Sequence, residues 1–242
     1  MKFIKLFLAL SASALFLSGN AFAQCSNTNL NVWSSVVNPN GRINVTTAAA
    51  MAGTACGLEA QVDFSAKHYV QDDSPTGESR YRGAFCIDPN SIAMPSSGTF
   101  RRFKLMNVRC AFGSCPYRQV MMMKLQHDGT TYSFDGYVRD GAGLPGNASS
   151  KNRFTVPISD QPTRIEWDLD IANGSLKVWV DASAESDTPV ITKTVDLSQW
   201  AGGVDSLRVG GLNNPTSIAE GSAIYLDEIE TRRQTFIGGS CL

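Results

Sequence analysis

Three acidic residues that alternate along one predicted strand have the clearest potential for chemistry. Glu166, Asp168 and Asp170 follow the order E-x-D-x-D, so their carboxyl groups share one face of that strand. A retaining glycosidase needs two carboxyl groups about 5 Å apart, whereas residues four positions apart on a regular strand are separated by about 13 Å. We therefore weigh catalysis by these residues against an ordinary acidic strand face, on which Asp170 pairs with Lys177 across a hairpin.

A second set of side chains suits recognition of a sugar. Sugar rings stack on aromatic side chains, and carboxylates and guanidinium groups bond their hydroxyls. If their strands neighbour one another in one sheet, the polar faces present a single ligand-binding surface. Its members would be Arg82, Asp135, Tyr137, Arg139, Asp168 and Trp179. The alternative is a solvated face on which Trp179 covers a neighbouring strand.

Two turn signals predict how the strands that carry these residues are paired. Asp128-Gly129 and Asn173-Gly174 are dipeptides typical of two-residue hairpin turns. Such turns set the register, and in the second hairpin the register matches apolar residues with apolar ones. The expected pairs are Leu125–Tyr132 and Met123–Phe134 in the first hairpin, and Ile171–Leu176, Leu169–Val178 and Trp167–Val180 in the second.

The rest of the chain repeats this strand-and-turn pattern at intervals of about ten residues. Residues 69–89 predict a turn-rich loop that leads into a long strand, and residues 222–238 predict a closing strand that ends at Arg232-Arg233. No repeat and no Pro/Ser linker divides the chain. The sequence therefore predicts one all-β domain over residues 24–242, a two-sheet antiparallel β-sandwich or jelly roll.

The first 23 residues predict a signal peptide. A positively charged start precedes an apolar run over residues 6–17, and Ala21 and Ala23 suit a signal peptidase. The run is too short to anchor the chain in a membrane. We therefore expect a soluble, periplasmic or secreted protein that starts near Gln24 and does not insert into the membrane after processing. The formal charge of −1 argues against nucleic acid as a partner.

Six cysteines in an exported chain predict three disulfide bonds. Cys110 and Cys115 flank a short loop between two predicted strands, so we expect them to pair across a hairpin. For the other four cysteines, the favoured pairings are Cys56–Cys86 and Cys25–Cys241, the latter joining the two ends of the mature chain.

Several segments, taken in order, resemble bacterial exported domains of the concanavalin A-like lectin/glucanase superfamily. They are GLEAQVDF, YVQDDSPTGESRYRGAF, GSLKVWVDA, DSLRVGG and IYLDEIETRR. That superfamily includes lectins, laminin-G-like adhesion modules, glycosidases and polysaccharide lyases. The resemblance implies two curved antiparallel sheets, with ligands on the concave face or at a loop rim.

The resemblance also suggests two kinds of catalytic site. The E-x-D-x-D order resembles the E-x-D-x-E signature of jelly-roll glucanases, whose two glutamates act as nucleophile and acid/base, although Asp170 is one methylene shorter. Gln126-His127, with Arg80 and Arg82 on another strand, invites comparison with jelly-roll alginate lyases. Those enzymes place Gln and His on one strand face, whereas adjacent residues point to opposite faces.

Asp227, in the closing strand, resembles the aspartate that often ligates a structural calcium in sandwich carbohydrate-binding modules. Calcium needs several oxygen ligands, and Asp227 could equally bond the backbone at a β-bulge. Apart from this calcium, we expect no cofactor.

Taken together, these patterns favour a non-enzymatic exported β-sandwich that binds a polysaccharide, a cell-surface glycan or another extracellular surface. One alternative is a glycan-cleaving enzyme, glucanase-like or lyase-like, that uses Glu166 and Asp168. Another alternative is a structural or adhesion module without a small ligand.

Overall fold

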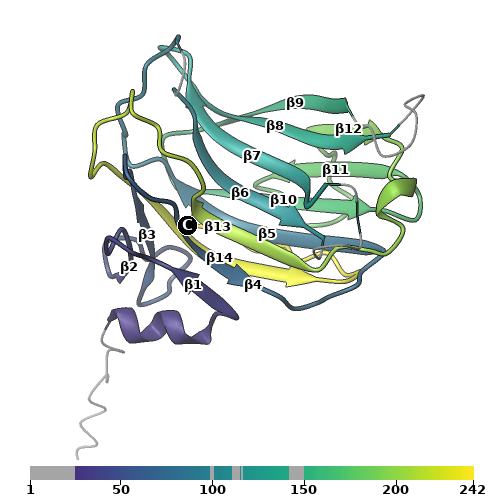
Figure 1. The fold of residues 1–242 in the computed structure, drawn as a ribbon, viewed down its shortest axis with the longest axis horizontal. Coiled ribbons are helices and arrows are strands. Elements are labelled where there is room, and N and C mark those ends of the chain that lie inside the picture. The colour runs from purple at the N-terminus through teal and green to yellow at the C-terminus, as the bar shows by residue number, and fades with distance from the viewer. Residues whose placement is uncertain (1–24, 99–100, 111–114, 116, 142–149) are drawn as a thin grey trace, which may run out of the picture.

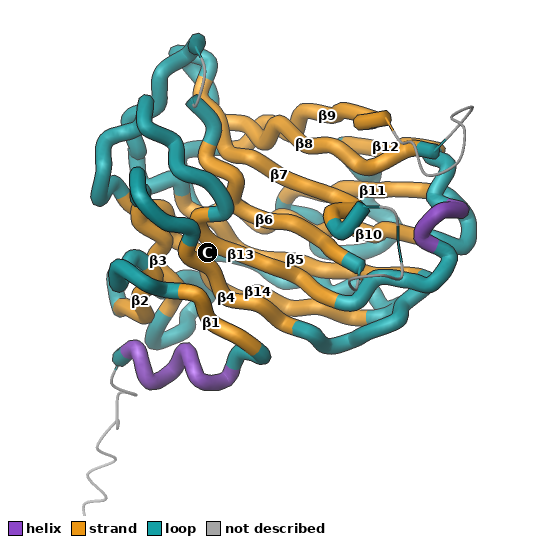
Figure 2. Tube along the Cα trace, viewed as in Figure 1, coloured by secondary structure: helices purple, strands orange, loops and turns teal. Residues whose placement is uncertain are grey.

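The computed structural model describes residues 25–98, 101–110, 115, 117–141 and 150–242, and nearly all of its regular structure is strand (Figures 1 and 2). Two short 3-10 helices, Asn27–Val32 and Ser198–Trp200, accompany the strands. The strands are β1 (Ser35–Val37), β2 (Ile43–Thr46), β3 (Gly57–Gln61), β4 (His68–Asp72), β5 (Arg80–Asp88), β6 (Phe103–Arg109), β7 (Gln119–His127), β8 (Tyr132–Asp140), β9 (Ser150–Ile158), β10 (Thr163–Asp170), β11 (Ser175–Val180), β12 (Ile191–Thr194), β13 (Ser206–Gly211) and β14 (Ala223–Arg232).

The strands form two stacked antiparallel sheets, which confirms the predicted sandwich (Figure 1). The first sheet has the order β1-β4-β13-β6-β7-β8-β9, and the second has the order β12-β11-β10-β5-β14-β3-β2. In the second sheet β14 pairs directly with β5. The stretches of residues 69–89 and 222–238, which contain β5 and β14, therefore lie side by side at the centre of that sheet.

Apolar side chains from the inner faces of both sheets form one core. Phe85 on β5 meets Phe134 on β8 edge to face, with 6.0 Å between ring centroids, and so links the two sheets. Trp167 is fully buried beside Phe85. Gly83 makes room for it, because a Cβ atom at that position would lie 2.1 Å from the indole ring.

Both predicted hairpin registers are wrong by two residues. The observed pairs are Leu125–Phe134, Met123–Gly136, Trp167–Val178 and Leu169–Leu176. The connections are longer because aspartates organise them: Asp128 accepts hydrogen bonds from the backbone of Thr130 and Thr131, and Asp170 from that of Asn173. Since side chains alternate with a period of two, a shift of two leaves each residue on its predicted face.

The disulfides are Cys25–Cys56, Cys86–Cys241 and Cys110–Cys115. The hairpin disulfide was predicted, whereas the pairings Cys56–Cys86 and Cys25–Cys241 were wrong. The N-terminal segment runs beside the loop that precedes β3, which brings Cys25 to Cys56. The chain end returns over β5, where Cys241 reaches Cys86.

The predicted signal peptide, residues 1–23, lies outside the described residues. Within the part of the chain that the structure describes, no helix is long and apolar enough to cross a membrane. The three disulfides are consistent with a location outside the reducing cytosol.

Candidate functional site

The six side chains predicted to share one ligand-binding surface lie on two different sheets, so that prediction was wrong. Arg82, Asp168 and Trp179 belong to the second sheet, on β5, β10 and β11. The other three belong to β8 in the first sheet; they are Asp135, Tyr137 and Arg139. Because all six avoid the shared core, the two groups face outward on opposite sides of the sandwich.

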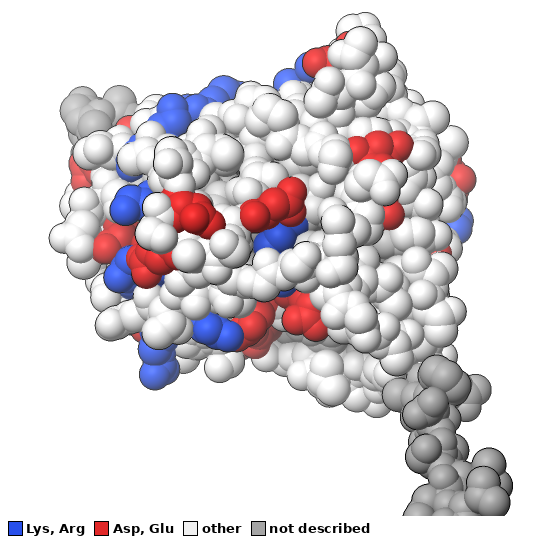
Figure 3. All heavy atoms as spheres, turned by 180° about the vertical axis from the view of Figure 1, so that it is seen from behind, with Lys and Arg blue, Asp and Glu red and all other residues white. Residues whose placement is uncertain are grey.

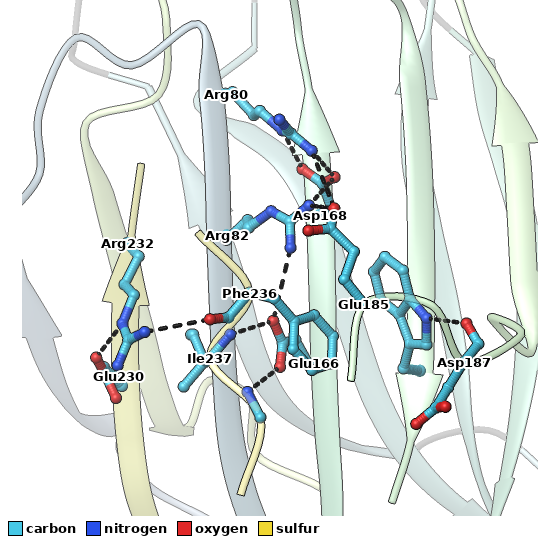
Figure 4. Close-up of polar contacts among 12 residues, drawn as sticks. Arg80, Arg82, Glu166, Asp168, Glu185, Asp187, Glu230, Arg232, Phe236 and Ile237 are labelled. Carbon is cyan, nitrogen blue, oxygen red and sulfur yellow. Dashed lines mark hydrogen bonds and ion pairs between the residues drawn. The ribbon is translucent and has the colours of Figure 1, made fainter. Parts of the chain in front are cut away.

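On the second sheet, the acidic residues of β10 are engaged by other parts of the chain (Figure 4). Asp168 receives two hydrogen bonds from Arg80, at 2.9 and 2.7 Å, and one from Arg82 at 3.0 Å. Its cross-strand neighbour on β11 is Lys177, in place of the expected Asp170–Lys177 pair. Asp170 caps the turn that follows β10.

Glu166 is closed off by the C-terminal segment, residues 233–242, which crosses over β10 (Figure 4). Its two carboxylate oxygens accept hydrogen bonds from the backbone N–H groups of Ile237 and Gly238, at 2.8 and 2.9 Å. Glu166 is 2% exposed and Asp168 is 4% exposed. A substrate cannot reach either carboxylate in this arrangement, so the geometry gives their predicted catalytic role no support.

Trp179 is covered by the same segment. The ring of Phe236 meets it edge to face, with 5.6 Å between centroids, and the indole N–H donates to the carbonyl of Asp187. Trp179 is consequently 2% exposed and unavailable for stacking on a sugar. The second sheet thus presents a closed outer face, on which acidic and basic side chains intermingle (Figure 3).

Asp227 lies at a β-bulge, where the register of β14 against β5 shifts. Its carboxylate accepts hydrogen bonds from the backbone of Met51 and Glu228 and from the hydroxyl of Thr54. A calcium ion at Asp227 remains a prediction. Among the described residues, no group of three or more His, Cys, Asp or Glu side chains is arranged to hold a metal ion.

The first sheet has a strongly basic outer face. Among the described outward residues of its four strands β6 to β9, the basic ones are Lys104, Arg109, Lys124, Arg139, Lys151 and Arg153, and the acidic one is Asp135. Asp135 is nearly buried and contacts three cations, Lys124 at 2.6 Å, Arg102 at 3.1 Å and Arg153 at 3.4 Å. Positive charge therefore exceeds negative charge on this face.

A cavity of about 420 Å³ opens at one end of this basic face. Its described lining consists of Lys67, Gly98, Arg101, Arg102, Lys104, Lys124, Leu212, Asn213 and Asn214. Asn213 holds the wall in place, since it accepts from the backbone N–H of Lys104 and donates to the carbonyl of Arg102. The lining thus contains five cationic residues and no acidic one.

Two lysines face each other inside this cavity. Lys104 on β6 and Lys124 on β7 are cross-strand partners, an arrangement of like charges that destabilises a sheet. Lys104 is exposed as a whole residue, but partial desolvation at the cavity wall, together with the positive charges of Lys67 and Lys151, lowers its pKa. Burial also lowers the pKa of Lys124, although its hydrogen bond to Asp135 opposes this shift. Lys104 can therefore lose its proton more readily than an ordinary lysine.

Tyr137 lies near the cavity on β8. Its hydroxyl donates to Oε1 of Gln119 at 3.0 Å, and the ammonium groups of Lys151 and Lys124 lie 5.0 and 5.7 Å from the ring centroid. Burial raises the pKa of this phenol, while Arg139 and other cations oppose the shift. Tyr137 consequently keeps its proton at neutral pH.

The Gln126-His127 pair points in two directions, as adjacency requires. Gln126 contacts Arg102 and Ser133 on the outer face, whereas the ring of His127 packs against Tyr132 at 4.6 Å. Sequence reasoning missed Lys67, Lys104 and Lys124. Alternation along β7 indicates that Lys124 points outward, but a bulge between Lys104 and Met106 breaks the alternation along β6. The sequence therefore does not reveal that Lys104 points outward and faces Lys124.

No protein-family model matches the sequence, and no curated protein matches it either. Solved structures with a similar fold include alginate lyase vAL-1 from Chlorella virus, with a TM-score of 0.51, 13% identity and coverage of 88% of this chain and 99% of that one. Alginate lyase PA1167 from Pseudomonas aeruginosa has a TM-score of 0.50, 16% identity and coverage of 74% and 83%. The catalytic domain of a GH131 beta-glucanase from Podospora anserina has a TM-score of 0.50, 13% identity and coverage of 90% and 95%.

At such low identity these similarities establish the fold, a concanavalin A-like jelly roll. They also overturn our first hypothesis, that of a non-enzymatic binding protein. The three similar structures are those of two alginate lyases and a beta-glucanase, which cleave glycans.

Proposed function

We propose that the protein cleaves an acidic polysaccharide by β-elimination on the outer face of the first sheet. The observation that carries this proposal is the basic cavity, in which Lys104 and Lys124 face each other across β6 and β7. A cavity lined by more positive than negative charges attracts an anionic ligand, and a polymer of uronic acids supplies one carboxylate per sugar. The similarity in fold to two alginate lyases supports the same reaction class.

Elimination suits this face better than hydrolysis does. Glycoside hydrolysis by the common mechanism uses two carboxyl groups on either side of the scissile bond. Among the described outward residues of β6 to β9, Asp135 is the one carboxylate, and three cations surround it. On β10 of the second sheet, Glu166 is closed off by the C-terminal segment, and Asp168 is held by Arg80 and Arg82.

In β-elimination a base removes the C5 proton of a uronate, a double bond forms between C4 and C5, and the bond from C4 to the glycosidic oxygen breaks. The leaving oxygen then takes up a proton. We assign Lys104 as the base, because it lines the cavity opposite Lys124 and its lowered pKa lets it release its proton more readily than an ordinary lysine does. Arg102 and Lys124, which line the cavity, stabilise the charge that develops on the uronate carboxylate, and solvent water supplies the proton for the leaving oxygen.

The test is incubation of the purified protein with alginate, pectate, hyaluronan and a neutral β-glucan. We expect unsaturated uronate products, detected by their ultraviolet absorbance, from at least one acidic polymer and none from the β-glucan. New reducing ends without unsaturation would indicate hydrolysis and contradict the proposal. Arg233→Gln is the matched control for substitutions in the cavity, because Arg233 is an exposed cation of the C-terminal segment, away from the cavity.

We also propose that the protein is an exported bacterial member of the concanavalin A-like superfamily, with residues 1–23 removed as a signal peptide. The three disulfides support export. N-terminal sequencing of the protein from the medium or periplasm is expected to start near Gln24. Recovery of the mature protein with residues 1–23 still attached would contradict this.

A further inference from the structure

Two polar side chains lack partners at the end of β6 that lies away from the cavity. Arg109 is 7% exposed, its Nε has no hydrogen-bond partner, and it forms no ion pair among the described residues. Asn107 is 3% exposed, and its Oδ1 likewise has no partner. Both lie on the outer face of the first sheet, on either side of Val108, which belongs to the core.

Arg208 completes this group from the adjacent strand β13, where it is the cross-strand neighbour of Asn107. It donates a hydrogen bond to Gln71 and lies over the ring of Tyr69, 4.3 Å from the centroid. In the described structure no carboxylate forms an ion pair with it. The group thus combines two guanidinium groups with one buried acceptor.

The electrostatics of this group are unfavourable without a ligand. Burial, followed by the positive charges of Arg208 and Arg118, lowers the pKa of Arg109 to about 10, and Tyr69 and Asp73 oppose the shift. Burial also lowers the pKa of Arg208. A buried charge that lacks a counter-charge destabilises a fold, so an anion from outside the chain would be bound strongly here.

The position of the group relative to the cavity limits the kind of ligand. Arg109 lies five residues beyond Lys104 on β6, which corresponds to about 16 Å along a strand. Gln119, which lies opposite Arg109 on β7, accepts a hydrogen bond from Tyr137. A single sugar cannot reach both the cavity and this group, whereas a polymer that runs along β6 can.

We propose that Arg109 and Arg208 form a second subsite, which binds the acidic group of a sugar several units away from the one in the cavity. Their two guanidinium groups bind the oxyanion. This inference rests on the proposed function, whose substrate it defines as a polymer that occupies both sites at once. The second site adds affinity only for chains long enough to bridge the distance.

The first experiment measures thermal stability without ligand. Arg109→Met keeps the apolar stem and removes the unpaired charge, so we expect the melting temperature to rise by about 2–4 °C. Arg233→Gln, which removes an exposed charge on the opposite side, is expected to leave it nearly unchanged. A clear fall for Arg109→Met would show that the arginine serves the fold and would overturn the proposal.

The second experiment measures binding of alginate oligomers of increasing length by calorimetry. The experiment compares two proteins, one with Arg109 and one with Arg109→Met. Both also carry Lys104→Arg, which keeps the charge in the cavity and prevents turnover. With Arg109 present, affinity is expected to rise steeply once an oligomer spans both sites. With Arg109→Met, the affinity for oligomers that span both sites is expected to be about tenfold lower or more, while the affinity for a disaccharide stays the same.

Equal affinity of the two proteins for every length would overturn the second subsite. This result is distinct from failure of the proposed function, which would appear as absence of cleavage by the wild-type protein. A third arm uses inorganic sulfate against chloride at equal ionic strength. Greater thermal protection by sulfate in the wild type than in Arg109→Met supports the subsite, and equal protection contradicts it.

Discussion

Lys104 and Lys124 occupy facing positions on neighbouring strands, although like charges there destabilise a sheet. A chain selected for stability alone would place opposite charges at such a pair. Lys124 is compensated by Asp135, whereas no carboxylate forms an ion pair with Lys104 in the described structure. The unpaired lysine is the residue whose chemistry the proposed reaction depends on.

Replacement of Lys104 by arginine separates its charge from its basicity. Arginine keeps the positive charge in the cavity but does not lose its proton near neutral pH. We therefore expect kcat to fall by about a hundredfold or more, with KM changed only a few-fold. The wild type should also gain activity as pH rises through the lowered pKa of Lys104, and Lys104→Arg should lack this limb. Full activity in Lys104→Arg would exclude Lys104 as the base.

His68 shows what burial does to a titratable side chain outside the site. It is completely buried, and the backbone of Ala66 and Gln61 and the charge of Asp63 favour its protonated form less than burial disfavours it. Burial lowers its pKa below the ordinary value of 6.5. The native protein therefore keeps this ring neutral, while the unfolded chain binds a proton below that value.

The free energy of unfolding is consequently expected to fall as pH decreases from about 6.5 toward about 5. Urea unfolding at a series of pH values measures this slope. His68→Leu should show a flatter slope over this window, because the leucine cannot titrate. The same slope in both proteins would mean that His68 does not control acid stability.

At the scale of elements, the C-terminal segment decides which outer face is open. It crosses the second sheet, places Phe236 on Trp179 and ends in the disulfide between Cys86 and Cys241. The carboxylate of Glu166 accepts hydrogen bonds from two backbone N–H groups of this segment. Glu166 of β10 therefore holds this segment in place.

Glu166→Gln tests this role directly. An amide presents one acceptor oxygen in place of two, so one backbone N–H loses its partner and the charge is gone. We expect a loss of about 1–3 kcal/mol in the free energy of unfolding, measured by urea unfolding, with polysaccharide cleavage unchanged. If Glu166→Gln abolished cleavage without lowering stability, Glu166 would have a catalytic role.

At the scale of the whole molecule, a nearly neutral chain has an uneven distribution of charge. The formal net charge is −1, yet the first sheet carries a basic outer face while acidic and basic side chains intermingle on the second (Figure 3). Local potential, and not net charge, governs the attraction of a charged polymer. The net charge therefore does not argue against an anionic substrate.

Binding of an acidic polysaccharide should accordingly depend on salt. Between about 0.05 and 0.5 M sodium chloride we expect the affinity of the Lys104→Arg protein for alginate to fall by at least about tenfold, because the Debye length shortens. Calorimetry at several salt concentrations measures this dependence. Affinity independent of salt would show that the contacts are mainly uncharged.

The sequence predicted those features that depend on residues close together in the chain. Alternation in β5, β8 and β10 correctly predicted strands and the direction of their side chains, since pleating is a local property. The turn dipeptides located both hairpins, but the aspartates Asp128 and Asp170 lengthened the turns and shifted the pairing by two residues. The Cys110–Cys115 disulfide was predictable because five positions separate the two cysteines.

The sequence by itself thus determined the sandwich, the faces of its strands and the outward position of Asp135 and Tyr137. Only the tertiary structure decided that β8 and β10 belong to opposite sheets, that Lys104 faces Lys124, and that residues 233–242 close the second sheet. The physical reason is that these arrangements join residues far apart in the chain. Their pairing is settled when the whole core packs, and no local pattern records it.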